Sequence, residues 1–178
     1  MIFTVSVILF IGLILATGAE RIYELVVSTR NAKLAFISGG IEYGRGHLPF
    51  MIALHTGLLA GAIIEVLLFD RLFLGSTGWV FLAIAIGCQA ARYWFIWALG
   101  SQWNTRVIVI PGAKLVRKGP YSLPWLRHPN YWVVAIEGIA LPMVHSAWIT
   151  AIMFTVLNSV LLLGFRIPTE NKALKGLR

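Results

Sequence analysis

The sequence is poor in charged residues and nearly free of cysteine. Of its 178 residues, 12% are charged and 58% are apolar, and the mean hydropathy is +0.81. The one cysteine, Cys88, lies inside an apolar run, which excludes an internal disulfide, a CxxC pair and a cysteine-based zinc site. No soluble core of this length needs so much apolar sequence, so the composition predicts a polytopic membrane protein.

Acidic residues are also few. There are seven Asp and Glu against fifteen Lys and Arg, and the formal net charge is +8. Such a surplus can indicate a nucleic-acid partner, but here the basic residues are confined to loops between apolar segments, so we expect no nucleic acid. The N-terminus has no basic region and no A-x-A cleavage site, and we therefore expect the first apolar segment to be retained.

Five apolar segments are candidate membrane spans. They cover about residues 2–17, 48–69, 78–99, 129–144 and 147–165. Only His145 and Ser146 separate the last two segments, which predicts a tight helical hairpin. The expected architecture is all-α, with about five transmembrane helices that end in this hairpin, in a single domain over residues 1–178.

The distribution of basic residues predicts the orientation of these spans. Thirteen Lys and Arg fall in the stretches 20–47 and 100–128 and in the tail, whereas the opposite side has only Arg71. Basic residues favour the cytoplasmic side. We therefore expect an integral protein of the bacterial inner membrane, with its N-terminus outside and its two long loops facing the cytoplasm.

The two long loops have different patterns. Residues 20–36 mix charged and apolar side chains at roughly helical spacing, which predicts an interfacial amphipathic helix that ends at Ser38-Gly39-Gly40. Residues 107–110 form an apolar run of β-branched residues that Pro111 terminates, which indicates an extended segment.

Three ionisable residues lie at a similar depth in the apolar segments. His55, Arg92 and Glu137 are each seven or eight residues from the same end, or about 10–12 Å at 1.5 Å per residue. Charges within a bilayer are costly and usually mark function. We expect Arg92 and Glu137 to pair or to bridge through a ligand, either in a polar pocket or as a purely structural ion pair. An isolated histidine such as His55 is more often simply packed and hydrogen-bonded.

The fourth segment begins with a polar cluster, residues 127–131 (Arg-His-Pro-Asn-Tyr). Proline at a first helical position is a start signal, and a helix N-terminus favours an anionic ligand. Arg127 and His128 add positive charge. Further on, Arg166 and Glu170 are four residues apart, a spacing that brings two side chains to one helix face. These features predict a site for a small anionic or zwitterionic molecule at the membrane rim.

Together, these motifs resemble the isoprenylcysteine carboxyl methyltransferase family. The pattern is Gly119-Pro120-Tyr121, then Arg-His-Pro-x-Tyr at 127–131, a short hairpin, and Arg-x-x-x-Glu at 166–170. The resemblance covers roughly residues 92–175. In the first half, residues 20–25 (ERIYEL) and the later stretch Trp103–Arg106 look like the bacterial branch that methylates alkylpyrones and phenolic lipids.

The resemblance implies a membrane-embedded methyltransferase that uses S-adenosylmethionine, with its cofactor-binding part in roughly residues 100–178. Two positions depart from the family pattern. Tyr121 and His128 are seven residues apart, where the family usually has five, and Asn171 follows Glu170 where a second acid is common. The cofactor-binding residues implied by the family are Arg106, Ala113, Lys114, Leu115, Val116, Tyr121, His128, Pro129, Asn130, Tyr131, Arg166 and Glu170.

The acceptor that we expect is a lipophilic molecule with an acidic oxygen, such as an alkylpyrone or a related polyketide lipid, which enters from the bilayer. Arg106 or Arg92 would bind an acceptor that is already anionic, whereas a phenol would need a base, for which Glu137 and His55 are candidates. The alternatives are a phospholipid N-methyltransferase, whose amine acceptor would favour acidic groups, and a small transporter or structural membrane subunit.

Overall fold

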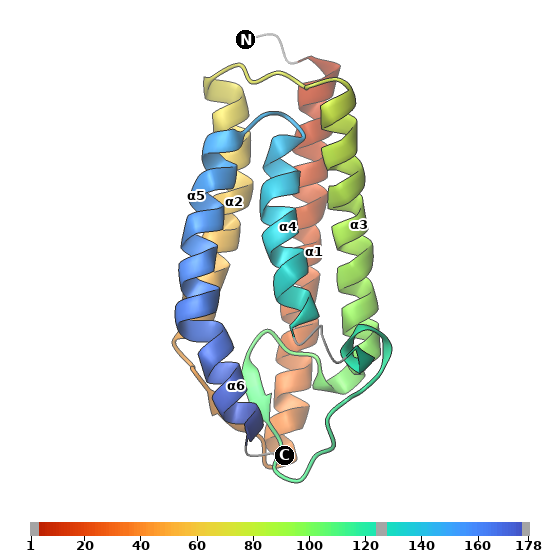
Figure 1. Ribbon diagram of the computed structural model, residues 1–178, viewed down its shortest axis with the longest axis vertical. Coiled ribbons are helices and arrows are strands. Elements are labelled where there is room, and N and C mark those ends of the chain that lie inside the picture. The colour runs from red at the N-terminus through yellow and green to blue at the C-terminus, as the bar shows by residue number, and fades with distance from the viewer. Residues whose placement is uncertain (1–3, 124–127, 176–178) are drawn as a thin grey trace.

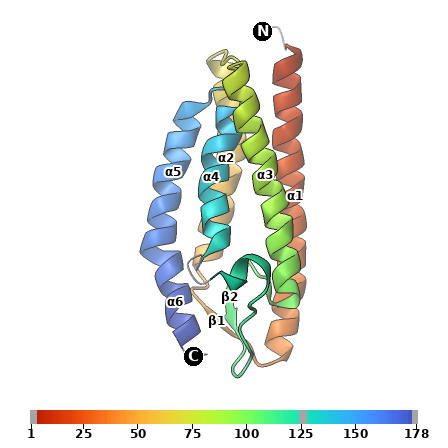
Figure 2. The same cartoon turned by 45° about the vertical axis from the view of Figure 1, so that its right-hand side comes forward.

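The computed structural model describes residues 4–123 and 128–175, and it is a bundle of long helices that run along one axis (Figure 1). The helices are α1 (Val5–Ile37), α2 (His47–Leu68), α3 (Ser76–Leu99), α4 (Pro129–Met143), α5 (Trp148–Leu161) and α6 (Ile167–Lys175). Short helical turns cover Gly100–Gln102, Gly119–Ser122 and Leu162–Arg166, and the strands are β1 (Ile41–Tyr43) and β2 (Val107–Val109). The strands and α6 lie at the end of the bundle opposite the N-terminus (Figures 1 and 2).

The helices have the length and composition of membrane spans. In the described part of the chain, four helical stretches are long and apolar enough to cross a membrane: Val5–Ile37, His47–Leu68, Ser76–Gln102 and Trp148–Lys175. Helix α4 has 15 residues, or about 22 Å, which is less than the roughly 30 Å of a hydrocarbon core. It packs between α3 and α5, and its N-terminus stops short of the end at which the strands lie (Figure 1). The all-α, polytopic architecture is confirmed.

The predicted break after the first span is wrong. Residues 20–36 do not form a separate interfacial helix, because α1 continues without interruption for 33 residues. Arg21 and Glu24 suggested an exit from the membrane, but Glu24 is buried and both side chains bind partners on other helices. Their charges are therefore satisfied inside the protein and need no contact with water.

The predicted hairpin of α4 and α5 is confirmed, and a carboxylate on another helix caps it. Glu65 of α2 accepts hydrogen bonds from the backbone N–H groups of Ile149 and Thr150, at 3.1 and 2.7 Å. It also pairs with Arg71 at 3.0 Å. Because the first N–H groups of a helix have no partner within the helix, Glu65 stabilises the start of α5 and ties it to α2.

A glycine allows the two arms of the hairpin to pack closely. A Cβ atom on Gly138 of α4 would lie 2.1 Å from the ring of Phe154 on α5. Both residues are buried. Any side chain at position 138 would therefore push α5 away from α4.

Two short strands close the end of the bundle near α6. The extended run predicted at residues 107–110 forms β2, which pairs in antiparallel fashion with β1 in the register Ile41 to Val109 and Tyr43 to Val107. Val107 and Val109 are buried against Ala173 of α6. The sequence did not predict β1, because three residues are too few for the alternation of Ile41, Glu42 and Tyr43 to indicate a strand.

Candidate functional site

A large cavity opens between the strands, α6 and the start of α4, and continues between α1 and α2. Its volume is about 1490 Å³, larger than the roughly 300–1,000 Å³ usual for one ligand. Polar residues of α4, α6 and the loop before β2 line the mouth, and apolar residues of α1 and α2, including Ile14 and Ile63, line the inner part. The cavity therefore has room for two reactants of opposite character.

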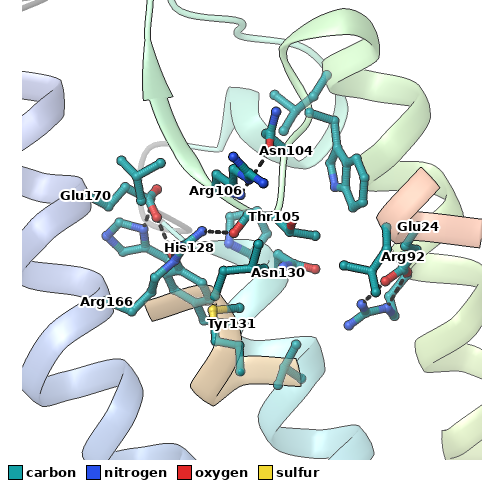
Figure 3. Close-up of a pocket in the computed structure, with 18 of the residues that line it drawn as sticks. Glu24, Arg92, Asn104, Thr105, Arg106, His128, Asn130, Tyr131, Arg166 and Glu170 are labelled. Carbon is teal, nitrogen blue, oxygen red and sulfur yellow. Dashed lines mark hydrogen bonds and ion pairs between the residues drawn. The ribbon is translucent and has the colours of Figure 1, made fainter. Parts of the chain in front are cut away.

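A chain of hydrogen bonds links three helical segments at the mouth (Figure 3). The Tyr131 hydroxyl donates to the Glu170 carboxylate, and Arg166 Nε donates to the Tyr131 oxygen at 3.1 Å. His128 Nδ1 lies 3.2 Å from Glu170 Oε1, and the His128 ring stacks on Tyr131 with ring centroids 5.4 Å apart. Arg166 and Glu170 do share one side of the helix, as predicted, but Tyr131 joins them in place of a direct ion pair.

A wide helical turn places Arg166 in this chain. Pro168 has no N–H, so it cannot bond to the Gly164 carbonyl, and its ring crowds that carbonyl. The turn Leu162–Arg166 relieves this conflict as a π-helix, a feature that is frequent at functional sites. Arg166 is buried, and its guanidinium donates to the Thr105 carbonyl. The π-turn thus joins the last helical stretch to the loop before β2.

Helix α1 fixes the shape of the stretch Trp103–Arg106. The Ser28 hydroxyl bonds to the side chains of Asn104 and Thr105 at 2.8 and 2.7 Å. One turn further on, Asn31 Nδ2 donates to the Trp103 carbonyl at 2.8 Å. Ser28 and Asn31 are both buried. These contacts explain why polar residues interrupt the apolar pattern of α1.

Arg106 enters the cavity from this fixed stretch (Figure 3). Its backbone N–H donates to Asn104 Oδ1 at 2.9 Å, which sets the direction of the chain. Its guanidinium lies 3.6 Å from the Glu42 carboxylate of β1 and is about one-third exposed. Exposed Arg45 lies at the same distance from Glu42 but does not line the cavity.

Five side chains, three of them buried, form a charge cluster between α1, α3 and α4. Arg92 and Glu137 lie 3.6 Å apart, as predicted from their equal depth. Arg21 bonds to Glu24 at 2.9 Å and to Glu137 at 2.6 Å, and Arg92 Nε bonds to Glu24 at 2.8 Å. Gln89 donates to Glu137 at 2.8 Å.

The charge cluster has no net charge, and each of its carboxylates contacts both arginines. Arg21, Glu24 and Arg92 line one side of the cavity, whereas Glu137 lies behind them. Arg21 and Glu24 were not predicted as site residues. Their spacing of three on one helix face, inside a helix otherwise rich in apolar residues, was the available signal.

The cavity collects nearly all of the residues that were expected to bind the cofactor. All except Lys114 line it; only the backbone carbonyl of Lys114 is held, by Gln102 at 3.3 Å. Asn130 lies between the polar mouth and the charge cluster (Figure 3). Arg127, part of the predicted cationic cluster, falls outside the described residues. Asn158 also lines the cavity, and the sequence analysis did not single it out.

The Gly119-Pro120-Tyr121 turn brings a phenol to the mouth. Gly119 has a φ of +52°, and a Cβ there would lie 3.1 Å from the Trp94 ring nitrogen, so glycine fits both constraints. Tyr121 packs edge-on against Phe95, with ring centroids 6.1 Å apart. Burial and the negative charge of Glu170 raise the pKa of Tyr121 well above its ordinary value. Its hydroxyl therefore remains a neutral donor at physiological pH.

The fold and the cavity define a membrane-embedded protein that can hold a polar ligand at its mouth and an apolar ligand within the bilayer. The family model for isoprenylcysteine carboxyl methyltransferases matches residues 80–176, so the chain belongs to this family and is a membrane methyltransferase. It is 38% identical over 157 residues to the uncharacterized protein YpbQ of Bacillus subtilis (strain 168), covering 88% of this chain and 90% of that protein. No solved structure matches the chain.

The charge cluster gives a prediction about stability. Arg92→Met should lower the free energy of unfolding by about 3–5 kcal/mol, because it leaves buried carboxylates without their partner. Adding Glu137→Gln should recover part of that loss. Arg45→Met, which removes an exposed pair, should change stability by less than about 1 kcal/mol. Equilibrium unfolding in mixed micelles measures these values, and strictly additive losses at positions 92 and 137 would contradict the coupling.

Proposed function

We propose that the protein is an S-adenosylmethionine-dependent O-methyltransferase that acts on an acidic oxygen of a lipophilic acceptor, an alkylpyrone or a related polyketide lipid. The observation that carries this proposal is one continuous cavity, which joins the family motif residues at its polar mouth to an apolar groove at membrane depth. Two substrates of opposite polarity can meet there without a separate soluble domain.

The residues at the mouth fit the chemical groups of S-adenosylmethionine. Glu170, held by Tyr131 and His128, suits the cofactor's amine or its ribose hydroxyls, since a carboxylate accepts their hydrogen bonds. Arg166, together with the N-terminus of α4, suits its carboxylate. Tyr121 would pack against or bond to the adenine ring. The bound cofactor would supply a methyl group on a positively charged sulfur.

The groove between α1 and α2 suits the acceptor's hydrocarbon tail. Leu15, Gly18, Leu59 and Ala60 line it, and Leu15 is 63% exposed. Along α2 it extends from Met51 to Ile63, which is about 18 Å at 1.5 Å per residue. An acceptor can therefore enter sideways from the bilayer while its polar end reaches the mouth.

The position of Arg106 favours an oxygen acceptor over an amine. A cation beside the reaction centre lowers the energy of an anionic nucleophile and repels an ammonium group. Methyl transfer also needs the nucleophile, the methyl carbon and the sulfur in line, and positioning of this kind can contribute about 7–11 kcal/mol in the best cases. Among enzymes, the alternative is a phospholipid N-methyltransferase. The charge cluster does not favour a transporter or a structural subunit, because its charges are paired with one another.

We further propose that the cavity opens to the cytoplasm of a bacterial cell. The described segments 38–46 and 100–123 and helix α6 lie at the cavity end of the bundle, which is the expected cytoplasmic side (Figure 1). They carry Arg45, Arg106, Lys114, Arg117, Lys118, Lys172 and Lys175. Single cysteines at Ser38 and Ser76, both exposed, should be labelled from opposite sides of the membrane. Native Cys88 is buried and should give little background. Labelling of both positions from one side would overturn this orientation.

The cofactor site gives a matched test on α6. Glu170→Gln should weaken S-adenosylmethionine binding at least tenfold, about 1.4 kcal/mol, because it removes the charge that binds His128 and Tyr131. His128→Ala should act in the same direction. Lys172→Gln changes an exposed charge on the same helix outside the cavity and should leave affinity unchanged. Calorimetric titration of folded protein measures all three, and wild-type affinity in both Glu170→Gln and His128→Ala would refute the site.

The acceptor assignment is tested with labelled cofactor. We expect label to appear in alkylpyrones added to membranes and not in phosphatidylethanolamine. Arg106→Ala should reduce turnover more than Arg106→Lys, and the lysine variant should still be impaired if the contact is bidentate. Arg45→Ala, which loses an equivalent contact to Glu42, should retain activity. Label found only in the phospholipid headgroup would favour the N-methyltransferase.

A further inference from the structure

Helices α2 and α5 bring two polar side chains to the middle of the cavity, opposite the charge cluster. His55 is eight residues from the start of α2, and Asn158 is eight residues before Arg166, so both lie about 12 Å inside the mouth. Both line the cavity. The His55 ring meets the Phe154 ring edge-on, with centroids 5.4 Å apart, and Phe154 lies one turn from Asn158 on the same face.

A backbone contact fixes which nitrogen of His55 carries the proton. His55 Nδ1 lies 2.8 Å from the carbonyl oxygen of Met51, one turn earlier in α2. A carbonyl can only accept, so Nδ1 must donate, and in the neutral ring Nε2 is left with a lone pair. Among the described residues, none forms a hydrogen bond with Nε2. An unshared lone pair on a fixed ring that lines a cavity is the arrangement that a general base needs.

Asn158 is an independent sign that this level of the cavity receives a polar ligand. It is 2% exposed, and its Oδ1 has no hydrogen-bond partner in the described chain. Leaving a buried polar atom unpaired costs about 1–3 kcal/mol. No described residue holds its amide, so a half-turn can present either the oxygen or the nitrogen to a bound molecule.

The opposite wall does not offer a free charge for an anion. The charges of Arg21 and Arg92 are balanced by Glu24 and Glu137, although Arg92 Nη1, which lies 3.6 Å from Glu137, has no hydrogen-bond partner in the described chain. Glu137 does not line the cavity, and it already accepts from Arg21 and Gln89, so it is a poor base for a ligand. An acceptor at this depth is therefore best bound as a neutral hydroxyl or enol, and its proton must leave during the reaction.

We propose that His55 is the general base of the methyl transfer and that Asn158 holds the acceptor's oxygen beside it. This inference rests on the proposed O-methyltransferase function and narrows its substrate to acceptors bound with their proton. The acceptor's O–H proton passes to His55 Nε2 as its oxygen forms a bond to the methyl carbon. The carbon–sulfur bond breaks, and its electron pair stays on sulfur, which becomes a neutral thioether. The imidazolium then gives its proton to water at the mouth.

The central test varies the acidity of the acceptor. With long-chain alkylphenols, His55→Gln should reduce kcat about 100-fold, within the range of 10²–10⁴ for general acid–base catalysis. With nitro-substituted alkylphenols, which are already ionised at neutral pH, the same variant should lose less than about tenfold, because little base catalysis remains to be lost. An equal loss for both acceptors would show a structural role for His55 and overturn the proposal.

A pH profile gives a second readout. Turnover of the alkylphenol should fall toward acid pH as His55 becomes protonated, and this limb should be absent in His55→Gln. Arg21, Glu24 and Arg92 line this part of the cavity from α1 and α3, and Glu137 of α4 lies behind them. All four are paired with one another, and α5 presents neutral Asn158. His128 at the mouth is a second ionisable side chain. It is unchanged in His55→Gln, so an acid limb that persists there would refute the assignment.

Binding without turnover tests Asn158. Asn158→Leu should weaken binding of the alkylphenol to cofactor-free protein about tenfold, measured by tryptophan fluorescence, while calorimetric affinity for S-adenosylmethionine stays within twofold. Thr155→Val on α5, whose hydroxyl bonds only to its own helix in the described chain, and His47→Gln on α2, which does not line the cavity, are matched controls. Unchanged alkylphenol affinity in Asn158→Leu would overturn its role. A wild-type protein that methylates neither phenols nor pyrones would instead overturn the proposed function itself.

Discussion

The charge cluster of α1, α3 and α4 is the contact on which the arrangement of the bundle depends. A bilayer supplies no water to solvate charges, so two arginines and two carboxylates at this depth require helices close enough to pair them. This requirement keeps α1 beside α3 and holds short α4 between its neighbours. Because α4 is anchored from within the bundle, its N-terminus can stop below the end of the molecule and leave room for the cavity.

The two sides of the cavity differ in polarity because the charge cluster lies on only one of them. On the side of α1 and α3, the charged side chains pair with one another and form a wall with no net charge. On the side of α2 and α5, apolar surface alternates with the neutral side chains of His55 and Asn158. A site of this kind can discriminate by hydrogen bonding at little electrostatic cost, and the positive charge needed for catalysis can come from the mouth and from the methyl donor.

Sequence reasoning reached the parts of this structure that follow from local pattern. Hydropathy gave the membrane architecture and the hairpin, β-branched residues marked β2, and counting residues from a common end predicted that Arg92 and Glu137 would pair. Sequence reasoning failed where a residue distant in the sequence determines the local structure. The charges of Arg21 and Glu24 have the same local pattern whether water or another helix satisfies them, so the continuity of α1 was missed. Asn158 is a polar residue in an apolar segment, but its unpaired oxygen, which points to a ligand, cannot be seen in the sequence.

The unbroken course of α1 has a mechanical consequence. One face of this helix binds the charge cluster through Arg21 and Glu24, and the same helix holds the loop Trp103–Arg106 through Ser28 and Asn31. A rigid α-helix turns by roughly 100° per residue. The two attachments are therefore locked in phase, and a change of one residue in the length between them would swing one set of contacts out of reach. Helix α1 therefore fixes the orientation of the loop that carries Arg106 relative to the charge cluster within the membrane.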